Sequence, residues 1–359
     1  MRLGYGRIAE AMAARGDSLE IVTPGRFPRV SRVHARWYPI LLPFAAAWWL
    51  WRRRRAFDVA LFHSYTGWVF NLATGGLPTV TAFHGLEPLW YAAEAEEHRA
   101  RGARLSWRFR FVHGWLMPRL LRLSCRRSAR VTCVNSEEAE YLRRHRWTTP
   151  ERLVVLKHGV PDFFFADDRA YAPRACHLIF ASQWISLKGI HALVPAFTAL
   201  ARERRDLELV CAGTRTADDA VRAAFPADVR AQVHNHPEMT QLDMAAAYRG
   251  ADIFVHASVT EAYGRSIAEA MAGGLPIVTT RVGVVIDLLA DGRDAVIVPK
   301  SDAGALEAAL RRLLDDRALR ARLGQAARQQ AATLRASERD RVVANLLCNA
   351  AAARDAATA

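Results

Sequence analysis

Cysteine is scarce in this chain of 359 residues and follows no chelating pattern. The number of cysteines is odd and no C-x-x-C pair occurs, which argues against disulfide bridges and metal ligands. We therefore expect reduced thiols packed in the core of a cytosolic protein. The five cysteines are Cys125, Cys133, Cys176, Cys211 and Cys348.

Long apolar runs are also missing. The longest uncharged stretch, WYPILLPFAAAWWLW at residues 37–51, is interrupted by Pro39 and Pro43. A membrane-spanning helix takes about 20 consecutive apolar residues, so this stretch is too short. The first residues, MRLGYGRIAEAMAARGD, lack the apolar core of a signal peptide. We expect a soluble or surface-bound protein.

Acidic residues are few in the first half of the chain. Residues 1–165 hold 26 Lys/Arg and 13 Asp/Glu, a net charge of +13, whereas residues 166–359 hold 24 and 23, a net charge of +1. The composition, 51% hydrophobic and 24% charged, is globular, and the length predicts about two domains. The charge asymmetry predicts that the two domains have different partners.

Short β-branched apolar runs alternate with amphipathic segments along the chain. Because the runs do not alternate polar with apolar residues, they predict strands buried on both faces. The predicted strands are 58–63, 78–84, 130–135, 152–159, 177–182, 207–213, 251–258, 276–280 and 295–299. The predicted helices are 7–15, 105–128, 137–146, 189–204, 218–224, 241–249, 265–272, 302–314 and 316–333. This alternation predicts two doubly wound parallel-sheet α/β domains, with a linker at 160–175.

The stretch TEAYGRSIAEAMAGGLPIV, residues 260–278, places two carboxylates around a predicted strand-to-helix turn. In a continuous helix, eight residues turn through about 800°, so Glu261 and Glu269 would lie about 80° apart. A loop broken at Gly264 lets both face one pocket, and the free amides of residues 265–267 would suit a phosphate. A pocket with two carboxylates and a phosphate-binding helix start would suit a nucleotide sugar. The alternative is that Glu261 caps the helix and Glu269 lies on the surface.

The stretch resembles the E-x7-E motif of the family-4 (group 1) retaining glycosyltransferases of the GT-B fold. Similarity extends to FASQWISLKGIHAL, LVCAG, AAAYRGADIFVHAS and the C-terminal run from Asp291 to Arg328. In the first half, GYGRIAEAMAARGDSLEIVTP, TAFHG and RVTCVNSEEAEYL also match. The resemblance implies two Rossmann-like domains facing a central cleft. Gly4-Tyr5-Gly6 resembles the end of the family's glycine loop, and the strand that should precede this loop is missing.

The resemblance also implies roles for individual residues. Glu269 resembles the glutamate that holds the ribose hydroxyls, and Glu261 the one beside the donor sugar and its leaving phosphate. Lys188 resembles the lysine that neutralises the donor diphosphate, which fits the negative charge that develops on a departing nucleoside diphosphate. His84 resembles the histidine that approaches the transferring sugar; its alternative role is a strand-end histidine bonded to backbone.

The resemblance further implies that the amides from Tyr263 through Gly264 and Arg265 to Ser266 contact the sugar and phosphate. Two departures from the family pattern bear on these roles. Ser182-Gln183 replaces the usual Gly-Arg, so either Arg265 supplies the second positive charge or donor binding is weaker. VGVVID replaces the Gly-Gly-x-x-Glu stretch, so that Asp287 takes the acidic place.

No metal site is expected from the sequence. A D-x-D motif is absent, and no carboxylate or cysteine completes a ligand set with His234 and His236. We expect these histidines to lie near the nucleotide base, and the alternative is a solvated loop. No cofactor is expected, because the nucleotide sugar is a co-substrate.

Two stretches of the basic half, 48–57 and 104–127, combine aromatic residues with arginines. Helices of this composition suit an anionic bilayer surface. The alternatives are a solvated face on core helices and nucleic acid, for which no fold signature is present. We expect a membrane surface and no nucleic-acid partner.

Together these features predict a metal-independent hexosyltransferase at the inner face of the cytoplasmic membrane. Residues 1–162 would bind a glycan or lipid-linked acceptor and the membrane, and residues 163–335 the nucleotide-sugar donor. Residues 336–359 would form a crossover helix and tail. Transfer would retain the anomeric configuration, in cell-envelope polysaccharide or glycolipid synthesis. The alternatives are a non-catalytic GT-B-fold protein that binds sugar or membrane, and a GT-B sugar epimerase.

Overall fold

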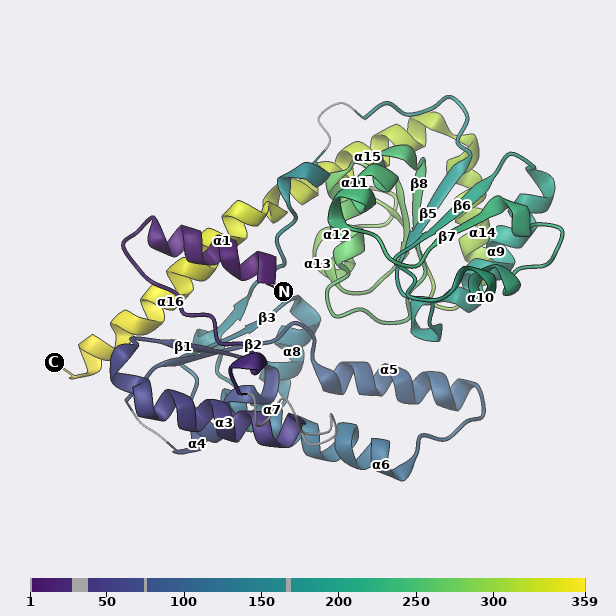
Figure 1. Cartoon of the computed structure of the whole chain (residues 1–359). Coiled ribbons are helices and arrows are strands. Elements are labelled where there is room, and N and C mark those ends of the chain that lie inside the picture. Colours follow the sequence, from purple (N-terminus) through teal and green to yellow (C-terminus); the bar gives the residue numbers. More distant parts are fainter. Residues whose placement is uncertain (1, 28–37, 74–75, 166–168, 359) are drawn as a thin grey trace. The chain divides into compact units, whose positions relative to one another are not determined.

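The computed structural model describes residues 2–27, 38–73, 76–165 and 169–358. They form two compact units (Figure 1). Unit 1 comprises residues 1–157 and 337–359, and unit 2 comprises residues 158–336. Each unit contains one parallel sheet flanked by helices, so the predicted fold class is confirmed. Among the described residues, no helix has the length and apolar character needed to cross a membrane.

The sheet of unit 1 has four parallel strands in the order β1-β2-β3-β4. The strands are β1 (Ala60–His63), β2 (Thr79–Ala82), β3 (Arg130–Cys133) and β4 (Leu153–Val155). All four lie within predicted strands. The central strand β2 is buried at every position, because helices cover both of its faces. This burial explains why its sequence shows no polar alternation.

The helices of unit 1 are α1 (Arg2–Ala13), α3 (Tyr38–Arg53), α4 (Trp68–Ala73), α5 (Glu87–Ala100), α6 (Trp107–Phe109), α7 (Met117–Cys125), α8 (Ser136–Arg144) and α16 (Ala336–Thr358). The predicted helix 105–128 is helical but includes a π-helical segment, Arg110–Leu116. Helices α3, α4 and α5 were not predicted. Of the uncharged stretch that begins at Trp37, α3 takes up residues 38–51, while Trp37 lies outside the described residues.

The prediction that Gly4-Tyr5-Gly6 ends a glycine loop is wrong. All three residues lie in α1. The helix forms because Ile8 and Met12, one turn apart, are both buried in one hydrophobic cluster. The same cluster contains Val343 and Leu347 of α16, which runs beside α1 (Figure 1). Within the described residues, the first strand is β1.

The sheet of unit 2 has six parallel strands in the order β10-β9-β8-β5-β6-β7. The strands are β5 (His177–Ala181), β6 (Glu208–Ala212), β7 (Val233–His236), β8 (Ile253–His256), β9 (Ile277–Thr280) and β10 (Val296–Val298). This is the doubly wound Rossmann order, in which the order of the strands reverses between the parallel neighbours β5 and β8. Strand β7 was not predicted, because it is an edge strand of polar sequence without the apolar run of a buried strand.

The helices of unit 2 are α9 (Ile190–Glu203), α10 (Asp218–Ala223), α11 (Gln241–Gly250), α12 (Arg265–Ala272), α13 (Val284–Leu288), α14 (Ala303–Asp315) and α15 (Arg317–Ala331). Side chains at their N-caps fix several of these starts. Thr240 forms a capping box with Asp243 at α11, and Asp302 and Asp316 accept backbone N–H bonds at α14 and α15. Helix α12 has the predicted bounds.

The expected linker 160–175 is anchored to unit 2, apart from residues 166–168, which lie outside the described residues. Arg169 donates to the carbonyl of Tyr248 at 3.1 Å, and the Tyr171 hydroxyl donates to that of Gly274 at 2.8 Å. The buried guanidinium of Arg320 donates to the carbonyl of Ala172 at 2.6 Å. These bonds satisfy backbone carbonyls that would otherwise be buried without partners.

Candidate functional site

The predicted donor residues of unit 2 gather beyond the carboxyl ends of β5 and β8. Lys188 lies in the turn that follows β5, and Ser258 and Glu261 lie in the loop that follows β8. These two strands are neighbours in the sheet and mark the point where the strand order reverses. Open α/β sheets bind ligands at such a point.

Glu261 is the centre of a polar cluster. Its Oε1 atom accepts a hydrogen bond from Lys188 Nζ at 2.5 Å and one from the Ser258 hydroxyl at 3.1 Å. His256 Nε2 lies 3.1 Å from the same oxygen. The Glu261 side chain is only 12% exposed, and that of His256 is fully buried. The sequence predicted Lys188 and Glu261 as separate contacts of a donor, and the structure joins them directly.

The electrostatics of this cluster keep Glu261 ionised. Burial alone would raise the pKa of Glu261, but the hydrogen bond and charge of His256, with the charge of Lys188, lower this pKa to about 2. A carboxyl group with so low a pKa cannot donate a proton near neutral pH. Glu261 can therefore accept hydrogen bonds and attract cations, but it cannot act as a general acid.

Gly189 explains why a glycine follows the lysine. Its φ is +74°, and a Cβ atom there would lie 1.9 Å from the carbonyl oxygen of Ala257. The turn is thus pressed against the end of β8, where Val259 N donates to Leu187 O at 2.9 Å. This close approach holds Lys188 next to the loop that bears Glu261.

Two further glycines shape the turn between Glu261 and α12. Gly264 precedes the helix with a φ of +80°, a conformation that residues with a Cβ atom seldom adopt. A Cβ atom on Gly283 would lie 2.4 Å from the carbonyl oxygen of Tyr263, which accepts a bond from Val284 N at 2.7 Å. The Tyr263 hydroxyl donates to His158 O at 3.2 Å. Tyr263 thus anchors the turn through both its backbone and its side chain.

The start of α12 corrects one expectation. Ile267 N donates to Gly264 O at 3.0 Å, so this amide is used within the helix and does not point to a ligand. Within the described part of the chain, the amides of Gly264, Arg265 and Ser266 make no such bond. The set available to an anion is therefore shifted by one residue towards the turn.

Glu269 lies one turn further along α12, in different surroundings from Glu261. Its side chain is 12% exposed, and Arg265 lies 3.5 Å from its Oε1 atom. Burial raises the pKa of Glu269 to about 7, against the charge of Arg265 and a hydrogen bond from Tyr248 of α11. No hydrogen bond or ion pair among the described residues joins the two glutamates.

Arg265 is the residue we expected to compensate for Ser182-Gln183. Its guanidinium is 58% exposed and lies at the first position of α12, beside the free amides. A positive charge there adds to the partial positive charge of the helix N-terminus. Arg265 is thus placed to interact with an anion, although it also pairs with Glu269.

In unit 1, His84 follows β2 and contacts a second histidine. Its Nε2 atom lies 2.9 Å from Nδ1 of His63, the last residue of β1, and the rings stack with centroids 4.9 Å apart. His63 Nε2 lies 2.5 Å from the Tyr5 hydroxyl. His84 is thus not a lone histidine at the end of a strand. It belongs to a chain of three polar rings, those of Tyr5, His63 and His84.

Burial and a nearby arginine keep this chain uncharged. Burial, then His84 and Arg339, lower the pKa of His63 to about 3, and burial and Arg339 lower the pKa of His84. Arg339 is on α16, and its buried Nε atom has no hydrogen-bond partner among the described residues. A neutral imidazole can donate one hydrogen bond and accept another without bringing a positive charge to the site.

Several of these residues were not assigned a role from the sequence. His63, His256 and Ser258 end strands or follow them closely, and this position was the available signal. Nothing in the sequence indicated a role for Glu138. Its buried carboxylate accepts hydrogen bonds from Leu86 N at 2.9 Å and from Val134 N at 3.1 Å. It thereby ties the loop after β2, which contains His84, to the loop after β3.

Comparison with known families matches both halves of the chain. Residues 175–330 match the model described as glycosyl transferases group 1, and residues 6–162 match the one described as Glycosyltransferase Family 4. A D-inositol 3-phosphate glycosyltransferase from Pseudarthrobacter chlorophenolicus is 32% identical over 214 residues, which cover 56% of this chain and 51% of the relative. The chain thus spans about half the length of that relative.

Solved glycosyltransferases share the fold. WaaG, a glycosyltransferase involved in lipopolysaccharide biosynthesis, matches with a TM-score of 0.68 and 20% identity, over 96% of this chain and 95% of WaaG. Alr3699/HepE of Anabaena, solved with UDP and glucose, matches with a TM-score of 0.62 and 15% identity, over 84% and 81%. At these identities the likeness establishes the GT-B fold and nothing finer.

Proposed function

Because the chain belongs to the group 1 glycosyltransferases of the GT-B fold, we propose that it transfers a sugar from a nucleotide-sugar donor to a glycan or lipid-linked acceptor. The observation that supports this most directly is the cluster of Lys188, Glu261 and His256 at the switch point of unit 2. Transfer would retain the anomeric configuration and use no metal, as the resemblance to the retaining family implies.

The donor would bind to unit 2. Lys188 would leave its pairing with Glu261, or share it, to neutralise the diphosphate, and the amides of Gly264, Arg265 and Ser266 would bind phosphate oxygens. Fixed donors of this kind stabilise the charge that develops on a leaving nucleoside diphosphate. Glu261, which stays anionic, would accept hydrogen bonds from the sugar, and Glu269 would accept them from the ribose.

The acceptor would bind to unit 1 near His84. Because the lowered pKa keeps this histidine neutral, it can hydrogen-bond to a sugar hydroxyl without bringing a positive charge to the acceptor. The leaving phosphate oxygen would take the acceptor proton. Arg339 lowers the pKa of both histidines, although it also pairs with the buried Asp340 at 2.9 Å.

The relatives support an acceptor of this kind. One acts, by its name, on D-inositol 3-phosphate, a phosphorylated polyol, and WaaG takes part in lipopolysaccharide biosynthesis. Alr3699/HepE was solved with UDP and glucose, which supports a uridine nucleotide among the donors to be tried first. We therefore propose a role in cell-envelope polysaccharide or glycolipid synthesis, which these relatives support.

Replacing Lys188 tests the donor assignment. In Lys188→Ala, nucleotide release from the preferred donor should fall by roughly a hundredfold, because a fixed charge on the leaving group is lost. The matched control is Lys300→Ala, since Lys300 is an exposed lysine after β10. Turnover of the Lys188 variant within twofold of that control would refute the diphosphate role.

A non-catalytic sugar-binding protein is the second candidate, and the Ser182-Gln183 replacement supports it. The two candidates separate in one screen of nucleotide sugars by thermal shift, followed by nucleotide release with acceptor present. A donor that raises the melting temperature and is then consumed supports the enzyme. A donor that binds but is never consumed supports the non-catalytic protein.

We also propose that unit 1 contacts an anionic membrane surface at the cytoplasmic face. Trp48, Trp107 and Trp115 are 61%, 71% and 46% exposed. Arginines stack on such rings: Arg52 lies 4.9 Å from the centroid of Trp48, and Arg119 lies 4.1 Å from that of Trp115. Exposed indoles beside guanidinium groups suit the headgroup region of an anionic bilayer.

Vesicle flotation tests this surface. The wild-type protein should float with anionic vesicles at low salt and be released as the salt concentration rises, because screening weakens the attraction. The double variant Trp48→Ser/Trp107→Ser should float less, whereas Leu242→Ser, at a 65% exposed leucine of unit 2, should not change flotation. Failure of the wild type to float at low salt would refute the proposal.

A further inference from the structure

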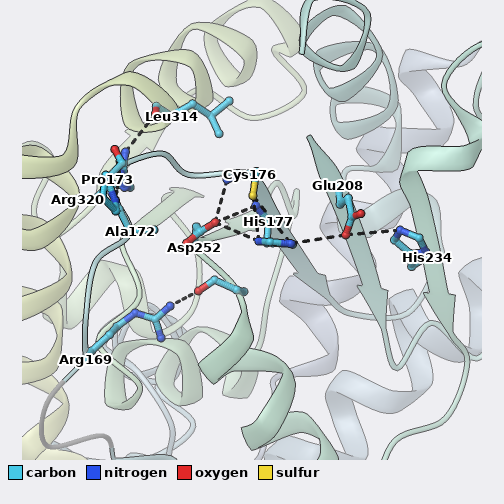
Figure 2. A network of polar contacts seen from close by, with 11 residues as sticks. Arg169, Ala172, Pro173, Cys176, His177, Glu208, His234, Asp252, Leu314 and Arg320 are labelled. Carbon is cyan, nitrogen blue, oxygen red and sulfur yellow. Dashed lines mark hydrogen bonds and ion pairs between the residues drawn. The ribbon is translucent and has the colours of Figure 1, made fainter. Parts of the chain in front are cut away.

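A second polar cluster lies at the opposite edge of the unit 2 sheet, where the strands begin. Cys176 and Asp252 immediately precede β5 and β8, and His177 is the first residue of β5. Figure 2 shows the three side chains pointing towards one another. The sulfur, one ring nitrogen and one carboxylate oxygen all lie within 4.8 Å of one another. This cluster was not expected from the sequence, because Asp252 is 75 residues from His177.

Two distances in this cluster are close to those of a metal-ligand set, and all three atoms lie within 4.8 Å of one another. Cys176 Sγ lies 3.2 Å from His177 Nδ1, which lies 3.4 Å from Asp252 Oδ2. Zinc bonds of about 2.3 Å to sulfur and about 2.0–2.2 Å to nitrogen and oxygen place tetrahedral ligand atoms about 3.3–3.6 Å apart. One ion could thus contact all three atoms after small side-chain adjustments.

We propose that Cys176, His177 and Asp252 bind one divalent cation of the Zn²⁺ class, with a water molecule in the fourth position. A thiolate, an imidazole and a carboxylate are ligands that zinc accepts in proteins. The expectation that the cysteines are not metal ligands would then fail for Cys176. The proposal concerns unit 2 alone and does not depend on the proposed sugar transfer.

A second carboxylate orients the histidine. Glu208, the first residue of β6, has its Oε2 atom 3.7 Å from His177 Nε2, and Cys176 Sγ lies 3.9 Å from the same ring nitrogen. His234 of β7 lies 3.7 Å from the same oxygen (Figure 2). Histidine ligands of metals usually have such a carboxylate on their other nitrogen, which fixes the tautomer and the ring orientation. The expectation that no carboxylate completes a ligand set with His234 and His236 stays a prediction, because Glu208 contacts His234 alone of the two.

The backbone positions the aspartate. Asp252 Oδ2 accepts hydrogen bonds from the amides of Cys176 and His177, both at 2.9 Å. The carboxylate is thus held in place even without a cation, and the same Oδ2 atom would share these two hydrogen bonds with the ion. The negative charge of three carboxylates, those of Asp252, Asp206 and Glu208, acts on the Cys176 thiol and favours a cation at this place. Three positive charges oppose this: Arg174 pairs with Asp206 at 2.9 Å, and the charges of Arg169 and Arg320 interact with Asp252.

The cation would be structural rather than catalytic. Strand β5 separates it from the turn that bears Lys188, and five residues at about 3.3 Å each extend over roughly 16 Å. Bound there, the cation would join the start of β5 to the start of β8, where the segment from Arg169 to Cys176 enters the sheet. It would stabilise unit 2 by mass action, since the unfolded chain lacks the assembled site.

Zinc titration of the untagged, reduced full chain tests the proposal. Calorimetry with ZnCl₂ should show one tight site per chain, and Zn²⁺ should raise the melting temperature. Both effects should be lost in Cys176→Ser and His177→Gln. The matched control is Cys348→Ser, because Cys348 is also a partly buried thiol next to a carboxylate, that of Asp17. Cobalt(II) should give a thiolate charge-transfer band in the wild type and the control, but not in Cys176→Ser.

A further variant separates a metal site from a purely structural cluster. Glu208→Gln should weaken Zn²⁺ binding by about 10- to 100-fold without changing the stoichiometry, as is usual when the carboxylate behind a histidine ligand is removed. Unfolding in urea with a chelator present should be the same for this variant and the wild type. Absence of a tight site in the wild type, or equal affinity in Cys176→Ser, would overturn the proposal.

Discussion

At the scale of single residues, the two glutamates of one motif differ because their neighbours differ. Glu261 lies among Lys188, His256 and Ser258, and its pKa falls to about 2. Glu269 lies against Tyr248 with one largely exposed arginine nearby, and burial raises its pKa to about 7. A carboxylate that is buried with compensating charges stays ionised, whereas one buried without enough of them does not.

Glu269 should therefore make the stability of unit 2 depend on pH. Its folded pKa, about 7, exceeds the ordinary value of 4.5, so the folded protein binds more protons than the unfolded chain between these values. Stability should fall as pH rises from about 4.5 to about 7, by at most roughly 3 kcal/mol. In Glu269→Gln this part of the pH dependence should disappear.

Urea unfolding of the wild type and the variant at pH 5 and pH 8 measures the effect. The control is Glu238→Gln, since Glu238 is an exposed glutamate of the same unit. The variant should also bind the donor nucleotide more weakly by calorimetry. An unchanged nucleotide affinity would refute the ribose role, and an unchanged pH dependence would refute the shifted pKa.

At the scale of elements, the site depends on turns that only glycine allows. Gly189, Gly264 and Gly283 have φ values of +74°, +80° and +54°, and each would bring a Cβ atom within 3 Å of a neighbour. For Gly189 and Gly283 that neighbour is a backbone carbonyl, which cannot move aside without shifting the loop. The Lys-Gly pair is thus a packing requirement as well as part of a motif.

Gly189→Ala should destabilise unit 2 by clearly more than the usual cost of a left-handed alanine, about 1–2 kcal/mol. The added Cβ atom would lie 1.9 Å from Ala257 O, so the turn bearing Lys188 must move. Gly292→Ala is the matched control, because its φ is +70° and nothing lies within 4 Å of the added atom. Urea unfolding and donor affinity measure both effects, and an equal loss in the two variants would contradict the packing argument.

At the scale of the whole molecule, the two ends of the chain belong to the same unit. Ile8 and Met12 of α1 pack with Val343, Ala344 and Leu347 of α16, and with Val80 in the middle of the sheet. Arg7 pairs with Asp340 of α16 at 2.9 Å. The last helix therefore completes the core of unit 1, although unit 2 lies between the two in sequence.

Removing one side chain of α16 should measure this contribution. Leu347→Ala should destabilise unit 1 by about 2–5 kcal/mol, because Leu347 is 3% exposed and its loss leaves a cavity. Val342→Ala, at a 39% exposed position of the same helix, should change stability by no more than about 0.5 kcal/mol. Similar effects of the two substitutions on thermal unfolding would show that α16 does not complete this core.

The strands and helices that could be predicted from the sequence are those whose residue pattern is complete within a short stretch of the chain. Runs such as HLIFA and IVTT became buried parallel strands, and α12 has its predicted bounds, because burial on both faces and helix-terminating glycines leave their mark within a few residues. Helices α3 and α5 and strand β7 were not predicted. The apolar residues of α3 are too dense and those of α5 too sparse to show a clear helical period. Strand β7 is an edge strand of polar sequence.

The contacts between side chains that are distant in sequence could be seen only in the folded structure. Lys188 and Glu261 are 73 residues apart, and His63 and His84 are 21 apart, yet each pair is in contact. The resemblance had assigned Lys188, Glu261 and His84 one at a time. Contacts across a sheet depend on which strands are neighbours, as β5 and β8 are in unit 2, and strand order is set by the packing of the whole unit rather than by any local stretch of sequence.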